Sequence, residues 1–209
     1  MARPRAIILL CPHETAADLS AFVRRSNADV GVSRVEDIEV LRDRVAACDG
    51  RARLISFLSD LIIPGDVLRS LTLTPYNIHG GPPEYPGSHA NSFAILEGAS
   101  AFGATAHEIT PRVDEGAIVA VARFDMPERP TRLGVADLAF EKAVGLFAMV
   151  ASHCARSDED LPRLDCRWGD RKTTKAAFRS LCERPAGDDA EADLLRRVCG
   201  PDWLGRRVA

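Results

Sequence analysis

Two polar residues in the middle of the chain, Asn77 and His79, have side chains that can work together in one site. They flank Ile78 at the predicted end of a short strand, and residues two apart in a strand face the same side of a sheet. Ile78 then points into the core, while an amide and an imidazole lie side by side. An isolated Asn-x-His is more often structural than catalytic, so the pair alone indicates a polar site and not a reaction.

An acidic residue follows in a tight turn between two predicted strands. The turn 111–116 contains Asp114 and joins strands expected at 105–110 and 117–124. Such a turn can carry a carboxylate to the end of a neighbouring strand, although an aspartate near a glycine is also an ordinary turn former. His107, on the first of these strands, suits either the same pocket or a hydrogen bond within the sheet.

Alternating apolar and amphipathic stretches predict the elements that position these residues. Strands are expected at 6–10, 28–32, 54–58 and up to residue 79, with helices over 16–23, 35–48 and 64–71 between them. Strands separated by helices indicate an α/β fold, an open and mostly parallel twisted sheet with helices on both faces. The Gly- and Pro-rich stretch 80–87 is then a loop at the carboxyl end of the fourth strand, where open α/β sheets bind ligands.

The second half of the chain continues this pattern and then becomes more polar. A helix is expected over 90–97, and a long helix whose apolar face runs from Phe140 to Cys154 follows the last strand. We expect a catalytic domain over 1–155. The remaining residues, 156–209, predict a short C-terminal helical arm or small appendage.

The composition is that of an ordinary globular protein. The 209 residues are 46% hydrophobic and 27% charged, and the net charge of -3 suggests neither a nucleic-acid nor an anionic-membrane partner. No apolar stretch approaches the roughly 20 residues of a membrane span. The first apolar run, 6–11, is too short for a secretory leader, so we expect a cytoplasmic protein. The six cysteines lack CxxC spacing, which favours small buried side chains and no metal site.

The stretch 54–124 resembles the folate-dependent formyltransferases, a family whose members act on glycinamide ribonucleotide, methionyl-tRNA and nucleotide-linked sugars. The matching motifs are Asn-Ile-His at 77–79, Tyr-Pro-Gly at 85–87, the helix 92–98, the strand and loop 58–64, and Gly-x-Thr-x-His to Asp-x-Gly-x-Ile across 103–118. The resemblance implies a Rossmann-like formyltransferase fold. It also implies transfer of a formyl group from 10-formyltetrahydrofolate, as cosubstrate, to an amine.

The resemblance implies catalytic roles for three residues. The family's catalytic asparagine, histidine and aspartate fall on Asn77, His79 and Asp114. Attack of an amine on a formyl carbon creates an oxyanion, which the Asn77 amide and a protonated His79 would stabilise. A carboxylate at Asp114 would favour that imidazolium and hold a water that carries the amine's proton.

Binding residues follow from the same resemblance. The positions whose backbone surrounds the pterin ring in the family match Ile62, Thr110 and Val113. Candidates for the acceptor side are Tyr85, His89 and His107. His89, close to a helix start, also suits a capping or surface role.

Departures from the family pattern narrow the acceptor. Gly80-Gly81 stands where the family often has Pro-Ser, which predicts a looser loop mouth. The loop after the first strand has Glu14 and lacks a glycine-rich phosphate turn, which disfavours glycinamide ribonucleotide. The acidic charge and short tail disfavour tRNA.

The segments 83–87 and 168–175 are similar to those of short sugar N-formyltransferases, which implies a nucleotide-linked amino sugar as acceptor. The basic cluster Arg171, Lys172 and Lys175 suits a diphosphate, a partner subunit or a solvated helix start. Another small amine, such as a siderophore hydroxylamine or an amino acid, stays open as the acceptor. A formyl-folate hydrolase and a non-catalytic folate- or nucleotide-binding module also stay open. The exposed strand 117–124 suggests a homodimer.

Overall fold

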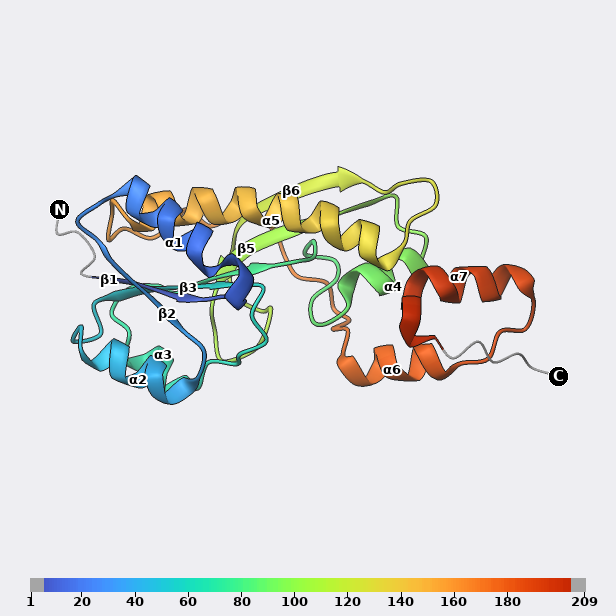
Figure 1. The fold of residues 1–209 in the computed structure, drawn as a ribbon, viewed down its shortest axis with the longest axis horizontal. Coiled ribbons are helices and arrows are strands. Elements are labelled where there is room, and N and C mark those ends of the chain that lie inside the picture. Colours follow the sequence, from blue (N-terminus) through green and yellow to red (C-terminus); the bar gives the residue numbers. More distant parts are fainter. Residues whose placement is uncertain (1–5, 204–209) are drawn as a thin grey trace.

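The computed structural model describes residues 6–203 and shows an open six-stranded sheet with helices on both faces (Figure 1). The strands are β1 (Ala6–Leu10), β2 (Gly31–Val35), β3 (Ala52–Phe57), β4 (Tyr76–His79), β5 (Ala101–Glu108) and β6 (Ile118–Asp125). Their order across the sheet is β2-β1-β3-β4-β5-β6. The pairings from β2 to β4 are parallel, and β5 and β6 run antiparallel to their neighbours. The predicted α/β fold is confirmed, with a mixed sheet.

Helices cover the two faces of the sheet in separate layers. On one face lie α1 (His13–Ser26) and α5 (Arg132–Cys154), and on the other lie α2 (Ile38–Ala46) and α3 (Gly65–Ser70). The apolar side chains of β1 contribute to the core on each face of the sheet. Ile7 and Leu9 belong to the core under α1 and α5, whereas Ile8 and Leu10 belong to the core under α2 and α3. A strand buried on both faces reads as a continuous apolar run for this reason.

A third apolar cluster lies beyond one end of the sheet, where the remaining helices gather (Figure 1). These are α4 (Ala90–Leu96), α6 (Lys175–Glu183), α7 (Asp189–Cys199) and the 3-10 helix η1 (Gly200–Asp202). The first two turns of α5 join the same cluster through Val135 and Ala139. The predicted C-terminal arm is therefore helical, and its last six residues lie outside the described part of the chain. Among the described helices, none is long and apolar enough to cross a bilayer.

Two strands begin three or four residues from the positions that the sequence predicts. The second strand was expected at 28–32 but begins at Gly31, because Asn27 starts a turn in which its Oδ1 accepts the Asp29 N–H at 3.1 Å. The strand expected at 105–110 covers Ala101–Glu108 instead. Gly103 allows this extension, since a Cβ there would lie 2.1 Å from the carbonyl oxygen of Ala122 on β6.

After α5 the chain returns across the start of β3 and β4, where Arg53 holds it. The Arg53 side chain is fully buried, donates to the Glu159 carbonyl at 3.1 Å and pairs with Asp160 at 3.3 Å. Two residues later, the Leu161 N–H donates to the Tyr76 hydroxyl at 2.8 Å. These contacts direct the following residues along the sheet toward the carboxyl end of β4.

Candidate active site

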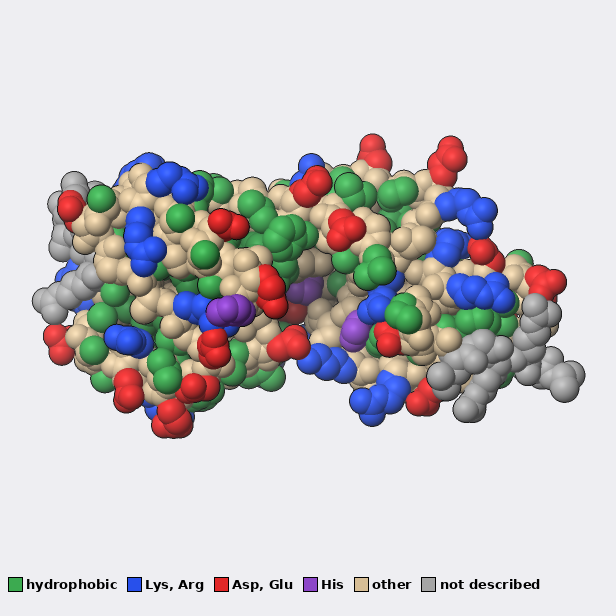
Figure 2. Space-filling view, viewed as in Figure 1, with side chains coloured by type: hydrophobic (Ala, Val, Ile, Leu, Met, Phe, Trp, Pro, Cys, Tyr) green, Lys and Arg blue, Asp and Glu red, His purple; other side chains and the backbone are tan. Residues whose placement is uncertain are grey.

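A cavity of about 900 Å³ opens at the carboxyl end of β4. The loops after β3 and β4, the start of α4, the turn after β5, one face of α5 and residues 172–175 line it. Figure 2 shows the surface hollowed between the sheet and the C-terminal helices, with histidine and acidic side chains at the edge of the hollow. The volume lies within the range of small-molecule sites, roughly 300–1,000 Å³.

Asn77 and His79 both line this cavity, while Ile78 between them is buried in the core. The two-residue period of β4 produces this arrangement, as the sequence predicts. Across the antiparallel pairing with β5, Asn77 lies opposite His107. Asn77 Nδ2 is 3.0 Å from His107 Nε2, so His107 belongs both to the sheet and to the site.

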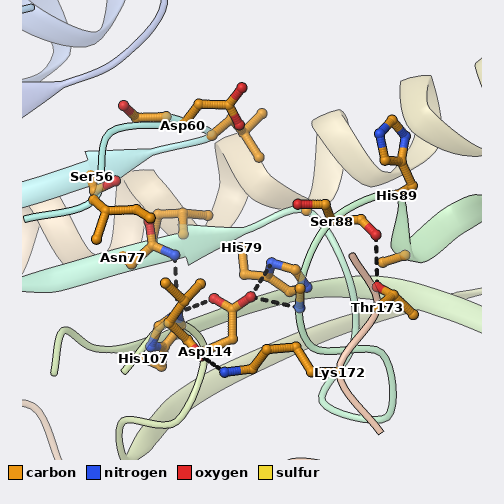
Figure 3. A pocket seen from close by; sticks show the side chains of 18 of the residues that line it. Ser56, Asp60, Asn77, His79, Ser88, His89, His107, Asp114, Lys172 and Thr173 are labelled. Atoms are coloured by element: carbon orange, nitrogen blue, oxygen red, sulfur yellow. Dashed lines mark hydrogen bonds and ion pairs between the residues drawn. The ribbon is translucent and has the colours of Figure 1, made fainter. Parts of the chain in front are cut away.

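Asp114 lies between the two imidazoles (Figure 3). Its Oδ2 is 3.4 Å from His79 Nδ1, and its Oδ1 is 3.3 Å from His107 Nε2. The Gly87 N–H donates to Oδ2 at 2.8 Å. Asp114 has φ 50°, a left-handed conformation that aspartate adopts more readily than most residues. The turn thus delivers a nearly buried carboxylate to the end of β4.

Backbone carbonyls orient both imidazole rings. His79 Nε2 lies 3.0 Å from the Tyr85 carbonyl, and His107 Nδ1 lies 2.8 Å from the Glu108 carbonyl. A carbonyl only accepts, so each of these nitrogens carries a hydrogen. In its neutral form His79 therefore has its lone pair on Nδ1, facing Asp114. Neutral His107 has its lone pair on Nε2, which can accept from the Asn77 amide.

Burial keeps His79 uncharged at neutral pH. Desolvation lowers the His79 pKa and outweighs the Asp114 carboxylate, which raises it; a charge on His107 lowers it further. The carboxylate acts in the expected direction, but the loss of water around the ring is the larger effect.

Asp114 itself stays ionised. Burial raises the Asp114 pKa, but the contact with His107, the proximity of His79 and the Gly87 N–H together lower it to about 2. A buried carboxylate that accepts a backbone N–H and lies beside two imidazoles keeps its charge. The site at neutral pH thus combines a fixed anion with a neutral base.

The three positions predicted to surround a pterin all line the cavity. They are Ile62, Thr110 and Val113. Ile62 is 67% exposed and Val113 is 44% exposed, and Phe140 of α5, also at the cavity, is 40% exposed. Apolar side chains left this open around a cavity suit an apolar or aromatic ligand.

The predicted acceptor-side residues lie in different surroundings. His89 lines the cavity, with φ 57° and its ring stacked on Phe178 at 3.9 Å. Its side chain makes no capping hydrogen bond to the described backbone of α4. Tyr85 packs its ring toward Phe102 at 6.2 Å and lies outside the described lining of the cavity. Its carbonyl, and not its ring, contacts His79.

The contribution of the segment 168–173 to the site was not predicted from the sequence. The Thr173 N–H donates to the Pro86 carbonyl at 2.8 Å, and the Ser88 N–H donates to the Thr173 carbonyl at 3.0 Å. Gly87 between them has φ 100°, and a Cβ there would lie 2.0 Å from the Thr173 oxygen. This pairing holds the Gly87 N–H that binds Asp114. The similarity of the tail to short sugar N-formyltransferases was the only signal for it, because no spacing rule links the two segments.

The predicted basic cluster is neutralised within the protein. The ion pairs are Arg171–Glu97, Lys172–Glu115 and Lys175–Asp60, the last two at 2.9 Å. Lys172 and Lys175 nevertheless line the cavity. Within residues 6–203, no group of three or more His, Cys, Asp or Glu side chains is arranged to hold a metal ion.

Comparison with known proteins agrees with this geometry. The model of the formyl transferase family matches residues 55–137. A 4-N formyltransferase from Francisella tularensis superposes with a TM-score of 0.76 at 18% identity, over 94% of this chain and 88% of that one. A sugar N-formyltransferase from a Shewanella species gives 0.75 at 17% identity, over 98% and 97%.

A third solved structure is an N-formyltransferase from Helicobacter canadensis in complex with folinic acid and dTDP-3-aminofucose. It superposes with a TM-score of 0.71 at 12% identity, over 98% of this chain and 84% of that one. At such identities the superpositions show the fold alone. The family match covers the stretch that carries Asn77, His79 and Asp114. Residues 55–137 therefore match the formyl transferase family model, and the chain has the fold of these sugar N-formyltransferases.

Proposed function

We propose that the protein moves a formyl group from 10-formyltetrahydrofolate to the primary amine of a nucleotide-linked amino sugar. The carrying observation is the cluster of Asn77, His79, His107 and Asp114 at a ligand-sized cavity, within a stretch that matches the formyl transferase family. The ligands of the Helicobacter canadensis relative, folinic acid and dTDP-3-aminofucose, support both the donor and the acceptor class.

The residues around the cavity fit a folate donor. Ile62, Val113 and Phe140 offer exposed apolar surface beside the polar cluster. An aromatic ring system bound against them would remove that surface from water. When bound there, 10-formyltetrahydrofolate supplies a formyl carbon that an amine can attack.

Asn77 stabilises the negative charge that develops on the formyl oxygen. One of its two amide hydrogens is directed to His107 Nε2, and the other remains for the oxyanion. His107 is itself fixed by the Glu108 carbonyl, so Asn77 is oriented before the substrate binds. A donor that is already in place is worth most in a site with little water.

The pair of His79 and Asp114 accepts the proton that the amine loses. The Nδ1 lone pair of neutral His79 and Oδ2 of Asp114 lie 3.4 Å apart, and the carboxylate stabilises the imidazolium once it forms. As the bond between the amine nitrogen and the formyl carbon forms, the bond from that carbon to the folate nitrogen breaks. His79 then returns the proton to the leaving nitrogen and becomes neutral again.

A nucleotide-linked acceptor would have to change the ion pairs of the basic residues at the cavity. Lys172 and Lys175 are already paired with Glu115 and Asp60. A diphosphate would have to replace those carboxylates as their partner. An uncharged or zwitterionic amine could bind without replacing these ion pairs. A screen of acceptors therefore has to include both nucleotide-linked amino sugars and amines without a diphosphate.

The test is release of tetrahydrofolate from 10-formyltetrahydrofolate with a panel of dTDP- and UDP-amino sugars, amino acids and hydroxylamines. We expect turnover that requires an amino-sugar nucleotide. His79→Ala and Asp114→Asn should each lower kcat by about 10²–10⁴-fold. His153→Ala is the matched control, because the His153 ring lies 2.8 Å from the Glu159 carbonyl near the end of α5 and outside the described lining of the cavity.

Other outcomes identify the alternatives. Turnover with a different amine would keep the transferase and change the acceptor. Release without any amine would indicate a formyl-folate hydrolase. Tight folate binding without release under any condition would indicate a binding module and contradict the proposal.

We further propose a homodimer. The edge strand β6 and the exposed α5 side chains Leu133, Val144 and Met149 offer the surface for it. Sedimentation of the full chain tests this, and a monomer at all concentrations would contradict it.

A further inference from the structure

We propose that Trp168 is a positioning residue of the active site, which holds the His79 and His107 rings against Asp114 and shields them from water. Its kinetic consequence rests on the proposed function. Its effect on the imidazoles does not, and can be measured without any turnover.

One indole contacts both imidazoles and the turn that carries Asp114. The Trp168 ring is perpendicular to His107, at 4.9 Å and 87°, and to His79, at 5.7 Å and 74°. Both distances lie in the range of favourable edge-to-face pairs, about 4.5–7 Å. The indole N–H donates to the Gly116 carbonyl at 2.8 Å and so also ties down the turn that carries Asp114.

The chain around Trp168 has little freedom to move. The N–H of the next residue, Gly169, donates to the Pro83 carbonyl at 2.9 Å. A Cβ on Gly169 would lie 2.6 Å from the Glu84 carbonyl oxygen, so only glycine allows this close approach. Trp168 is thus held from its own backbone, and its side chain is held through Gly116.

Trp168 lies outside the described lining of the cavity. It therefore acts through the two imidazoles and not by touching a bound substrate. This distinction predicts a kinetic signature. Loss of the indole should lower kcat, because misplacing a catalytic group by about 1 Å costs on the order of 100-fold. The KM values for donor and acceptor should stay within about threefold of wild type, because no binding contact is lost.

The protonation of His79 supplies a second signature. The groups that face this ring are the Asp114 carboxylate from the turn, His107 from β5 and the Tyr85 carbonyl from the loop, with the indole as apolar cover. Removing the indole lets water reach the ring while the three polar groups remain. The His79 pKa should then rise toward its ordinary value, because its main depressing cause is burial.

The experiment is a histidine NMR titration of the full chain, with kcat and KM measured beside it. The chain has five histidines, so each resonance can be assigned by substitution. The variants are Trp168→Ala, Trp168→Phe and Trp168→Leu. Trp203→Ala is the matched control, because the second tryptophan of the chain packs among the C-terminal helices and donates to the Arg184 carbonyl.

We expect Trp168→Ala to raise the His79 pKa and lower kcat by about 10–100-fold, and Trp203→Ala to change neither. If Trp168→Ala does not fold, the other two variants decide. Phenylalanine keeps an aromatic edge and leucine does not, so the His79 pKa should rise further in the leucine variant. An unchanged His79 titration in the folded alanine variant, or equal titrations in the other two, would overturn the proposal. If wild type shows no turnover, the proposed function fails while the titration still decides the role of Trp168.

Discussion

Gly81 leaves no room for a side chain beside His79, and this can be tested with a single methyl group. A Cβ added at Gly81 would lie 2.6 Å from His79 Nε2 and 2.9 Å from the Ala90 Cβ, whereas ordinary contact begins at 3.4 Å. The Ala90 methyl belongs to a helix and cannot yield, so the imidazole has to move by about 0.8 Å. That movement breaks the 3.0 Å hydrogen bond from Nε2 to the Tyr85 carbonyl. It also turns Nδ1 away from Asp114.

The expected size of the effect follows from this displacement. A shift of about 1 Å in a catalytic group costs on the order of 100-fold, so Gly81→Ala should lower kcat by about that factor. Overpacking of a buried position costs about 1–3 kcal/mol of folding free energy. For a chain of this size that lowers Tm by roughly 2–10 °C. Gly81→Ser, which restores the residue often found in the family, should behave the same way.

Steady-state kinetics and thermal unfolding measure these two quantities, with two matched controls. Gly80→Ala places its Cβ 3.1 Å from Leu58 Cδ2, the end of a flexible side chain, and should keep kcat within about threefold. Gly145→Ala meets nothing within 4 Å on α5 and should be stabilising by about 0.5–1 kcal/mol. A Gly81→Ala enzyme with wild-type kcat would refute the reasoning. The buried, closely packed Gly81 also contradicts the expectation of a looser loop mouth.

Further predictions concern pH, the interior and the C-terminal segment. Because burial lowers the His79 pKa, the acid limb of kcat/KM should lie below pH about 6.5. In Asp114→Asn the acid limb of the residual activity should move to still lower pH, because the carboxylate that raises the His79 pKa is lost. A move to higher pH would contradict the assignment of this limb to His79. The free energy of unfolding should fall as the pH drops below about 6.5, because His79 then binds a proton in the unfolded chain but not in the native protein. His79→Gln should weaken this pH dependence, as measured by denaturant titrations at several pH values. Arg53→Met should lower the free energy of unfolding by about 3 kcal/mol, because it removes the hydrogen bonds from a buried guanidinium to the Thr74 and Glu159 carbonyls, and an unchanged Tm would contradict this. Thr173→Val removes the hydroxyl that donates to the Ser88 carbonyl at 2.7 Å. This change should lower the free energy of unfolding by about 1–2 kcal/mol and kcat several-fold. Wild-type stability together with wild-type kcat would contradict the prediction.

Local rules predict one part of the site well. The period of a strand places Asn77 and His79 on one face, and a turn between two strands places a carboxylate at their edge. The opposition of His107 and Asn77 depends instead on the register between β4 and β5, in which Asn77 pairs with His107 and His79 pairs with Thr105. No short-range signal reports such a register.

Long-range partners explain what the sequence could not predict. From the sequence, Arg53 is a charged residue just before an expected strand. In the structure it is fully buried, because residues 157–160, more than a hundred positions later, provide partners for its guanidinium. Tyr85 reads as a ligand-binding aromatic in a loop. The direction of its ring is set by Phe102 on β5, which no loop pattern indicates.

The pairing of Thr173 with the loop after β4 has a consequence for how the protein is made. The bonded residues are 85 to 87 positions apart, and the chain between them includes two strands and α5. At a synthesis rate of about 5–20 residues per second, Thr173 follows the loop by roughly 4–17 seconds. During that interval the sheet can form on the ribosome, while the loop that fixes Asp114 still lacks its partner. A nascent chain that has reached the end of α5 therefore has its scaffold but lacks the segment that holds the Gly87 N–H against Asp114, and we expect the site to be complete only after Thr173 has been translated.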